Sequence, residues 1–175
     1  MNNSIEEHHW LASPQAAGFL ANTFEQIENK VNVVRIAKSL RKEMTPARSA
    51  LVLELAQLRI RARKKFTLAE QMFFTKRGLQ QASGYEIADY KARRFVECTR
   101  VADICCSIGG DLLALAKVAE TVGVDNDPVT TLYARRNAEV HDLQNASTAE
   151  CDFEDFDLAG FDGIHIDPDL SLIHI

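Results

Sequence analysis

The sequence predicts an α/β protein in which a helical region, residues 1–98, precedes the first half of a parallel sheet, residues 99–169. Up to about residue 98, apolar residues recur every three or four positions, which is typical of packed helices. Beyond it, short apolar runs that end in small or acidic residues alternate with helical stretches, as in a parallel α/β sheet. The charge also changes there: residues 35–100 hold sixteen basic and six acidic residues, whereas residues 101–175 hold three and fifteen.

The composition excludes several classes of protein. No apolar run approaches the roughly 20 residues that span a bilayer, and the N-terminus lacks a signal pattern, so we expect no membrane association and a cytoplasmic location. The four cysteines have neither paired spacing nor a histidine partner at zinc-finger distance, which predicts no metal site and no disulfide framework. Nothing in the composition indicates the oligomeric state.

The helical region contains three helix start signals. Thr45-Pro46 is the clearest, because Thr accepts a hydrogen bond from the first turn and Pro has no N–H to leave unsatisfied there. Residues 67–70 and 83–86 have the capping-box spacing, a Ser or Thr followed three residues later by Glu, and predict two further helices. The apolar residues that we expect in the helical core are Leu51, Leu55, Leu58, Ala62, Met72, Phe73, Phe74 and Phe95.

Basic residues crowd the end of the helix that begins at Thr45. They are Arg59, Arg61, Arg63, Lys64 and Lys65. Clustered Lys and Arg supply the sequence-independent part of nucleic-acid affinity, so RNA is a candidate partner of the region that is basic from 35 to 100. Cations also suit the negative end of a helix dipole, so a solvated helix end without a ligand is the alternative.

Strands and helices alternate in the second part of the chain. The expected strands are residues 101–104, 121–124, 145–149 and 161–166, and the expected helices are residues 111–119 and 128–140. Asp127 is placed to cap the second of these helices, with Pro128 as its first residue.

The first strand runs into a small-residue turn with the sequence VADICCSIGGD, residues 101–111. Gly109 and Gly110 have no Cβ, so the turn lets the backbone approach a nucleotide-like ligand closely. Asp103 would repel the pyrophosphate of a dinucleotide, which disfavours a nicotinamide-dependent oxidoreductase. It would attract the cationic ammonium and sulfonium groups of S-adenosylmethionine.

A second acid follows the second strand, in the sequence VGVDNDP. Asp125 comes 22 positions after Asp103 and is placed to accept hydrogen bonds from both ribose hydroxyls of the same cofactor, and we expect its neighbour Asn126 there too. Asp152 follows the third strand, where an acceptor for the adenine amine is expected. An exposed acidic loop is the alternative interpretation of Asp152.

The fourth strand ends in Asp167-Pro168. An Asp-Pro turn at this tip points into the same crevice and could hold a planar amine, whose hydrogens the Asp carboxylate and the Pro carbonyl accept. His165 lies within the strand and is expected to be a packed histidine rather than a base.

Together these motifs resemble the class I S-adenosylmethionine-dependent methyltransferases, which have a Rossmann-like sheet, over about residues 99–169. The sequences DICCSIGGD and VDNDP are similar to those of the bacterial group known as THUMP-like, with a more distant likeness to trimethylguanosine synthase. In this resemblance Ser107 stands where many relatives have Gly. The residues that it places at the cofactor are Asp103, Ser107, Gly109, Gly110 and Asp125, and Asp167-Pro168 begins its catalytic target-base motif.

The resemblance also implies that the chain is an N-terminal fragment, truncated after the Asp-Pro motif. A complete sheet of this class has strand order 3-2-1-4-5-7-6, of which the first four strands fit here, so we expect the fragment to be inactive. After Pro168 the family continues with Pro or Ala, whereas this chain has Asp169. Residues 170–175, LSLIHI, back-translate as CTG TCT CTT ATA CAC ATC, the end of a transposon sequencing adapter, and are expected to be non-native.

The predicted function is S-adenosylmethionine-dependent methylation of RNA on a nitrogen, with a guanine exocyclic amine as a candidate target. The alternative is a non-catalytic S-adenosylmethionine-binding or structural fragment.

Overall fold

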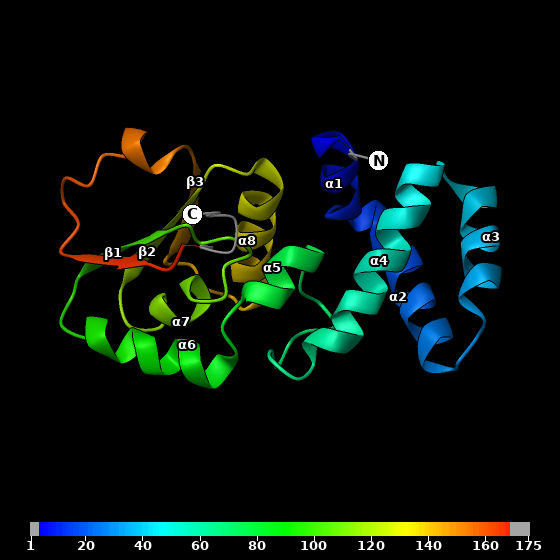
Figure 1. Cartoon of the computed structure of the whole chain (residues 1–175), viewed down its shortest axis with the longest axis horizontal. Coiled ribbons are helices and arrows are strands. Elements are labelled where there is room, and N and C mark those ends of the chain that lie inside the picture. Colours follow the sequence, from blue (N-terminus) through cyan, green and yellow to red (C-terminus); the bar gives the residue numbers. More distant parts are fainter. Residues whose placement is uncertain (1–3, 169–175) are drawn as a thin grey trace, which may run out of the picture.

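The computed structural model describes residues 4–168, and the expected adapter-derived tail, residues 170–175, lies outside the described residues. The helical part consists of α1 (Ile5–Leu11), α2 (Pro14–Glu28), α3 (Val33–Glu43), α4 (Pro46–Ala62), α5 (Lys76–Gln81), α6 (Tyr85–Ala92) and η1 (Arg93–Phe95). The sheet part consists of β1 (Arg100–Ile104), α7 (Leu112–Leu115), β2 (Glu120–Asp125), α8 (Pro128–Val140), β3 (Ala146–Glu150), η2 (Phe153–Asp155) and β4 (Gly163–Ile166). Figure 1 shows the two parts side by side.

Helix α4 begins at the predicted signal. The Thr45 hydroxyl accepts a hydrogen bond from the backbone N–H of Arg48, 3.3 Å away, and Pro46 is the first helical residue. The apolar side of α4 is buried, and the residues expected there, Leu51, Leu55, Leu58 and Ala62, all lie in the core.

The helix predicted to start at residues 67–70 is absent, because this segment forms turns. The Glu70 carboxylate pairs with Arg63 of α4, at 2.7 Å, instead of capping a helix. The buried Arg59 of α4 donates to the Met72 carbonyl oxygen, 2.9 Å away, and so holds the segment against α4. Tertiary donors thus replace the helical hydrogen bonds that the local sequence predicts.

A helix begins instead after Thr75, whose hydroxyl accepts from the backbone N–H of Gly78 at 2.9 Å. Helix α6 forms after Ser83, but its N-cap is Gly84 and no side chain caps it. The predicted capping by Ser83 is therefore wrong. Its hydroxyl lies 2.9 Å from the Lys91 ammonium, which donates to it.

The four predicted strands form one parallel sheet with the order β3-β2-β1-β4. Strand β1 lies in the centre, so that Asp103 is aligned with Gly123 of β2 and with His165 of β4. Because all four strands are parallel, their carboxyl ends lie along one edge of the sheet, where ligands bind in open α/β sheets.

The first crossover helix is shorter than predicted. Helix α7 spans Leu112–Leu115, whereas residues 111–119 were expected to be helical. The backbone N–H groups of Lys117 and Val118 donate to carbonyl oxygens three residues back, which tightens the chain into turns. This brings the chain quickly to Glu120, the first residue of β2.

Helix α8 has the predicted bounds, Pro128–Val140, because its N-cap is set locally. The Asp127 carboxylate accepts from the backbone N–H groups of Val129, at 2.7 Å, and Thr130, at 3.2 Å. Two donors of the first helical turn that would otherwise lack partners are thereby satisfied.

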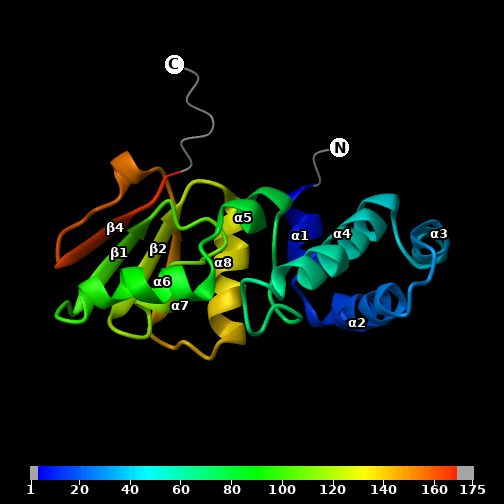
Figure 2. The ribbon, with the colours of Figure 1, turned by 60° about the horizontal axis from the view of Figure 1, so that its bottom comes forward.

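Helices and a loop cover the two faces of the sheet. Helices α6 and α7 pack on one face beside α8, as Figure 2 shows. The segment of residues 151–161 packs on the other face, with Phe156 and Leu158 against Ile104 and Val124. A single buried cluster continues from helices α1 to α4 into α8, so the helical part and the sheet part share a core.

Candidate functional site

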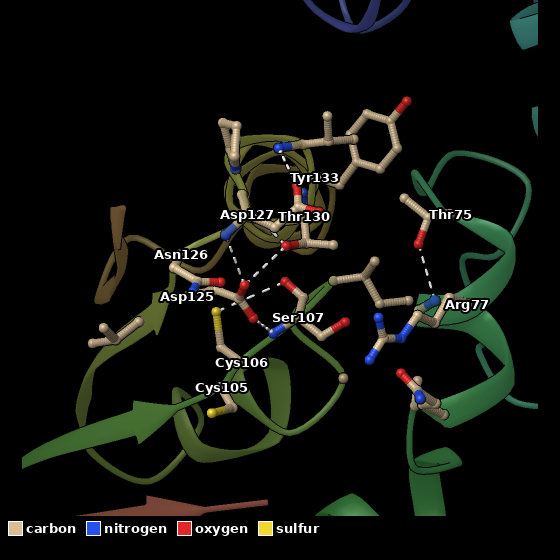
Figure 3. A pocket seen from close by; sticks show the side chains of 18 of the residues that line it. Thr75, Arg77, Cys105, Cys106, Ser107, Asp125, Asn126, Asp127, Thr130 and Tyr133 are labelled. Carbon is tan, nitrogen blue, oxygen red and sulfur yellow. Dashed lines mark hydrogen bonds between the residues drawn. The ribbon is translucent and has the colours of Figure 1, made fainter. Parts of the chain in front are cut away.

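A large cleft opens between the carboxyl edge of the sheet and the helical part. Its volume is about 1510 Å³, above the roughly 300–1,000 Å³ of most small-molecule pockets. The ends of all four strands contribute to its walls, together with α1, α4, α5 and the start of α8. Figure 3 shows the residues around the ends of β1 and β2.

The loop after β1 has an unusual backbone. Cys105, Ser107 and Gly109 have φ of 62°, 50° and 85°, in the left-handed region that favours glycine. Gly109 has no room for a side chain either, since an added Cβ would lie 3.2 Å from Ala134 of α8. Ser107 and Gly110 line the cleft, whereas Gly109 faces α8. Cys105 also lines the cleft, although the sequence analysis did not single it out.

Asp103 is buried at the wall of the cleft, with 2% of its surface exposed. Its Oδ1 lies 2.9 Å from Nδ1 of His165, whereas its buried Oδ2 has no hydrogen-bond partner among residues 4–168. Burial raises the pKa of the Asp103 carboxyl group. Because an unpaired buried acceptor is costly, this oxygen indicates a ligand that donates a hydrogen bond.

His165 is packed rather than open to the cleft, as predicted. Its ring meets Phe95 edge to face, with the ring centres 6.1 Å apart. The hydrogen bond with Asp103 raises the pKa of the His165 imidazole. His165 therefore fixes the orientation of the Asp103 carboxylate from behind the cleft.

Asp125 accepts hydrogen bonds from the loop after β1 and from the start of α8. Its Oδ2 accepts from the backbone N–H of Ser107, at 2.8 Å, and its Oδ1 from that of Asp127, at 3.0 Å. The Thr130 hydroxyl lies 3.2 Å from the same Oδ1 (Figure 3). A carboxylate has about four acceptor positions, so about one is left for a ligand, fewer than two ribose hydroxyls would need.

Asn126, which follows β2, and Asp152, which comes after β3, contact each other. The Asn126 amide donates to Asp152 Oδ1 at 2.7 Å, and both residues are exposed in the wall of the cleft. Glu154 and Asp155 line the cleft beside them. Asp152 thus lies where a cofactor acceptor was predicted and also in an exposed acidic loop.

The tip of β4 is tied to the helical part by Lys91 of α6. The Lys91 ammonium lies 2.6 Å from Asp167 Oδ2, 2.9 Å from Asp111 Oδ2 and 2.9 Å from the Ser83 hydroxyl. Burial alone would lower the pKa of Lys91, but the hydrogen bonds with the two carboxylates raise it above its ordinary value. Asp167 and Pro168 both line the cleft. No sequence signal distinguishes Lys91 from the other basic residues of positions 35–100.

The helical part supplies the opposite wall of the cleft. In Figure 3, Thr75 and Arg77 lie across the cleft from the loop of Ser107. Further along, His8 of α1 lies with its Nδ1 2.7 Å from the Tyr133 hydroxyl of α8. No local pattern predicts these contacts, since they join segments far apart in the sequence.

Most of the basic cluster at the end of α4 is used within the fold. Arg59 is buried, which lowers the pKa of its guanidinium to about 10, and it donates to two backbone carbonyl oxygens. Arg63 pairs with two glutamates, and the Lys65 ammonium donates to three carbonyl oxygens at the end of α5. Only Arg61 and Lys64 of this cluster are exposed without a partner in the described part of the chain. The cluster is therefore mainly structural.

Two further findings concern metals and membranes. Within residues 4–168, no group of three or more His, Cys, Asp or Glu side chains is placed to hold a metal ion, and the four cysteines are free. No helix in the described part of the chain is long and apolar enough to cross a bilayer.

Comparison with known proteins agrees with this geometry. The chain is 44% identical over 68 residues to an uncharacterized S-adenosylmethionine-dependent methyltransferase of Mycobacterium tuberculosis, found in strains CDC 1551 and H37Rv. The match covers 38% of this chain, which spans about a fifth, 19%, of the relative. A crystal structure of a protein from Porphyromonas gingivalis W83, assigned as a methyltransferase, is 25% identical with a TM-score of 0.54, over 63% of this chain and 29% of the other. No protein-family model matches the chain.

The sheet order, the acids at the ends of β1 and β2 and these similarities define a class. Over its described strands the chain has the Rossmann-like fold of the class I S-adenosylmethionine-dependent methyltransferases. The cleft fits the cofactor of that class, because Asp103, which has an unpaired carboxylate oxygen among residues 4–168, is one of the residues that line it and would suit a cationic ammonium. The finer likeness to the THUMP-like group and to trimethylguanosine synthase stays a prediction.

Proposed function

We propose that this chain binds S-adenosylmethionine in the cleft and acts in methyl transfer. When bound, this cofactor supplies a methyl group attached to a positively charged sulfur. The observation that carries the proposal is that Asp103 lines the cleft and that its buried Oδ2 has no partner in residues 4–168. A ligand ammonium there turns an unpaired acceptor into a charge-assisted hydrogen bond.

The other cofactor contacts follow from the order of the strand ends. Asp103 at β1 receives the ammonium, and Asp125 at β2 accepts from a ribose hydroxyl through its remaining acceptor position. Asn126 and Asp152 lie further along the same edge and receive the adenine. Residues 107–110 form the loop that lets the cofactor lie close to the backbone.

Asp167 and Pro168 hold the acceptor amine in this proposal. A planar amine that donates its hydrogens to the Asp167 carboxylate and the Pro168 carbonyl keeps its nitrogen directed at the cofactor, which favours transfer by orientation. We propose RNA as the substrate and a guanine exocyclic amine as the target. The basic charge of residues 35–100 and the Asp-Pro tip support this choice.

A non-catalytic cofactor-binding fragment is the second candidate. The observation that favours it is the ion pair of Lys91 with Asp167, at 2.6 Å, because Lys91 occupies the carboxylate that an acceptor amine needs. The two candidates share the cofactor site and differ in turnover. A methyl-transfer assay therefore separates them.

Asp125→Ala should weaken the binding of S-adenosylhomocysteine by roughly 1–3 kcal/mol, because it removes a fixed carboxylate that accepts a ligand hydrogen bond. Isothermal titration calorimetry measures the change. Glu97→Ala is the matched control, since Glu97 is exposed and lies away from the cleft. Equal affinity in the wild type and the Asp125 variant would contradict the cofactor assignment.

The transfer step is tested with labelled S-adenosylmethionine and bulk RNA. Label in the RNA that ribonuclease releases supports the RNA methyltransferase. Cofactor binding without transfer to RNA, protein or small amines supports the non-catalytic fragment.

A further inference from the structure

Helix α3 carries a face of basic side chains that have no partner. Arg35, Lys38, Arg41 and Lys42 are all exposed, and none makes a side-chain hydrogen bond or ion pair within residues 4–168. This distinguishes α3 from the end of α4, where three of five cations hold the fold together. Helix α3 therefore presents four such cations on one element, whereas the end of α4 presents two, Arg61 and Lys64.

The four cations of α3 share one side of the helix. At 3.6 residues per turn, they fall within about a third of its circumference. Ile36 and Leu40 lie on the opposite side and are buried, and the acid Glu43 lies outside the basic arc. The exposed apolar residue within the arc is Val34. The face is thus uniformly positive and almost without apolar area.

Helix α4 separates this face from the cleft. Leu51, Glu54 and Leu55 of α4 line the cleft, and α3 packs against α4. Figures 1 and 2 show α4 between α3 and the sheet part. Because the buried side of α3 packs towards α4, the basic face points away from the cleft. A polymer bound there reaches the cleft by passing around two helices, each about 10 Å across.

We infer that the basic face of α3 binds the sugar-phosphate backbone of RNA and holds it beside the cleft. This rests on the proposed function, because it supplies the docking surface of the proposed RNA substrate. The sheet side of the cleft is acidic, with Asp125, Asp127, Asp152 and Glu154, and repels phosphates while it suits a cationic cofactor. Lys76 and Arg77 line the opposite side, on α5. The sheet side of the cleft therefore disfavours phosphates, whereas α3 offers four exposed cations without a partner in residues 4–168.

The chemistry of the face favours RNA over a membrane surface. A helix that lies on a membrane inserts bulky apolar side chains next to its basic residues. On α3 the apolar residues Ile36 and Leu40 are buried against the rest of the protein. The exposed apolar residues of α3, Val33 and Val34 at 39% and 62%, are small and lie in its first turn, so they do not provide an inserting face.

The test is a triple variant of the chain, R35Q/K38Q/K42Q, with R61Q/K64Q/R135Q as the matched control. Both variants remove three exposed cations that lack partners in residues 4–168. Glutamine keeps high helix propensity, and circular dichroism checks the fold. The probe is a labelled single-stranded RNA of about 20 nucleotides, and fluorescence anisotropy measures its affinity at several salt concentrations.

The α3 variant should bind RNA at least tenfold more weakly at low salt. The slope of log affinity against log salt should fall by about 2, at about 0.7 for each lost phosphate contact. The control should keep the affinity and slope of the wild type. Equal affinity and slope in the α3 variant and the wild type would overturn the inference, as would a loss confined to the control.

Two parallel measurements distinguish a failure of RNA binding by α3 from a failure of the cofactor proposal. Vesicles of phosphatidylcholine and phosphatidylserine that bind the wild type but not the α3 variant, with RNA binding unchanged, assign the face to membranes and overturn the inference. Titration with S-adenosylhomocysteine reports the proposed function separately. If it binds while RNA binding is independent of α3, the inference fails and the cofactor proposal stands.

Discussion

At the level of single residues, Asp103 carries an energetic conflict in the ligand-free protein. Its carboxylate is buried, and only one of its oxygens has a partner, His165, among residues 4–168. Few buried acceptors in proteins are left unpaired, and each such group is a candidate for a functional role. In the proposed function, a cationic ligand resolves the conflict.

Asp103→Asn should therefore separate stability from ligand binding. The amide oxygen can still accept the hydrogen bond from His165, but the cost of burying a charge disappears. At a pH above the raised pKa of His165, we expect a melting temperature no lower than that of the wild type and an affinity for S-adenosylmethionine lower by roughly 1–3 kcal/mol. Differential scanning calorimetry and titration calorimetry provide the two values. A lower melting temperature with unchanged affinity would mean that Asp103 has only a structural role.

The hydrogen bond of His165 to Asp103 should make stability depend on pH. It raises the folded-state pKa of His165 above its ordinary value of 6.5. The pair therefore contributes stability that is fully present below pH 6.5 and is lost as the pH rises through the raised pKa. Burial lowers the pKa values of His8 and His141. Their effect on the stability of the folded protein has the opposite sign, because it decreases stability as the pH falls.

A His165→Gln variant isolates this contribution. Between about pH 6 and pH 9, the melting temperature of the wild type should fall more than that of the variant, which keeps the other histidines. NMR titration of the imidazole should give His165 a pKa above 6.5. A wild type and variant with parallel pH profiles would contradict the assigned role of the pair.

At the level of elements, a buried amide joins the two parts of the protein. Asn137 of α8 accepts from the backbone N–H of Phe73 at 2.7 Å. Its amide nitrogen donates to the carbonyl oxygens of Phe73 and Ile108, each at 2.9 Å. One side chain thus connects α8, the segment before α5 and the loop after β1.

Asn137→Ala should lower the free energy of unfolding by about 2–4 kcal/mol, because it leaves buried backbone groups of Phe73 and Ile108 without partners. Urea denaturation measures the loss. Arg135→Ala on the exposed side of the same helix is the control, with an expected change within about 0.5 kcal/mol. Similar values for the two variants would show that the amide does not connect the parts energetically.

At the level of the whole molecule, the sheet has an open edge at β4. No strand pairs with the outer side of β4 within residues 4–168, and the side chains of Ile164 and Ile166 are 45% and 54% exposed. An exposed apolar edge strand is a template for pairing with another chain. We therefore expect the described part of the chain to favour self-association.

Ile164→Lys should reduce this association, since a charge on an edge strand opposes pairing. Size-exclusion chromatography with light scattering measures the mass across a range of concentrations. Ile87→Lys on α6 is the control, because Ile87 is also exposed but does not lie at the sheet edge. A monomeric wild type, or equal effects of the two variants, would contradict the edge mechanism.

The sequence predicted those elements whose start or apolar pattern is encoded within a few residues of the element itself. The four strands, the bounds of α8 and the starts of α4 and α8 follow from apolar patterns and from the caps Thr45 and Asp127. Asp103, Asp125 and Asp167 were also placed at the cleft, because parallel strands bring their carboxyl ends to one edge. These signals lie within a few residues of the structures that they specify.

The tertiary structure decided which partners the polar side chains take. Glu70 pairs with Arg63 instead of capping a helix, and the Ser83 hydroxyl accepts from Lys91 instead of from a helix end. The unpaired oxygen of Asp103 likewise depends on the alignment of β1 with β4. A charged or polar side chain binds whichever donor or acceptor the fold brings near it, and burial strengthens that choice. Its local sequence therefore determines what it can bind, and the packing of distant segments determines what it does bind.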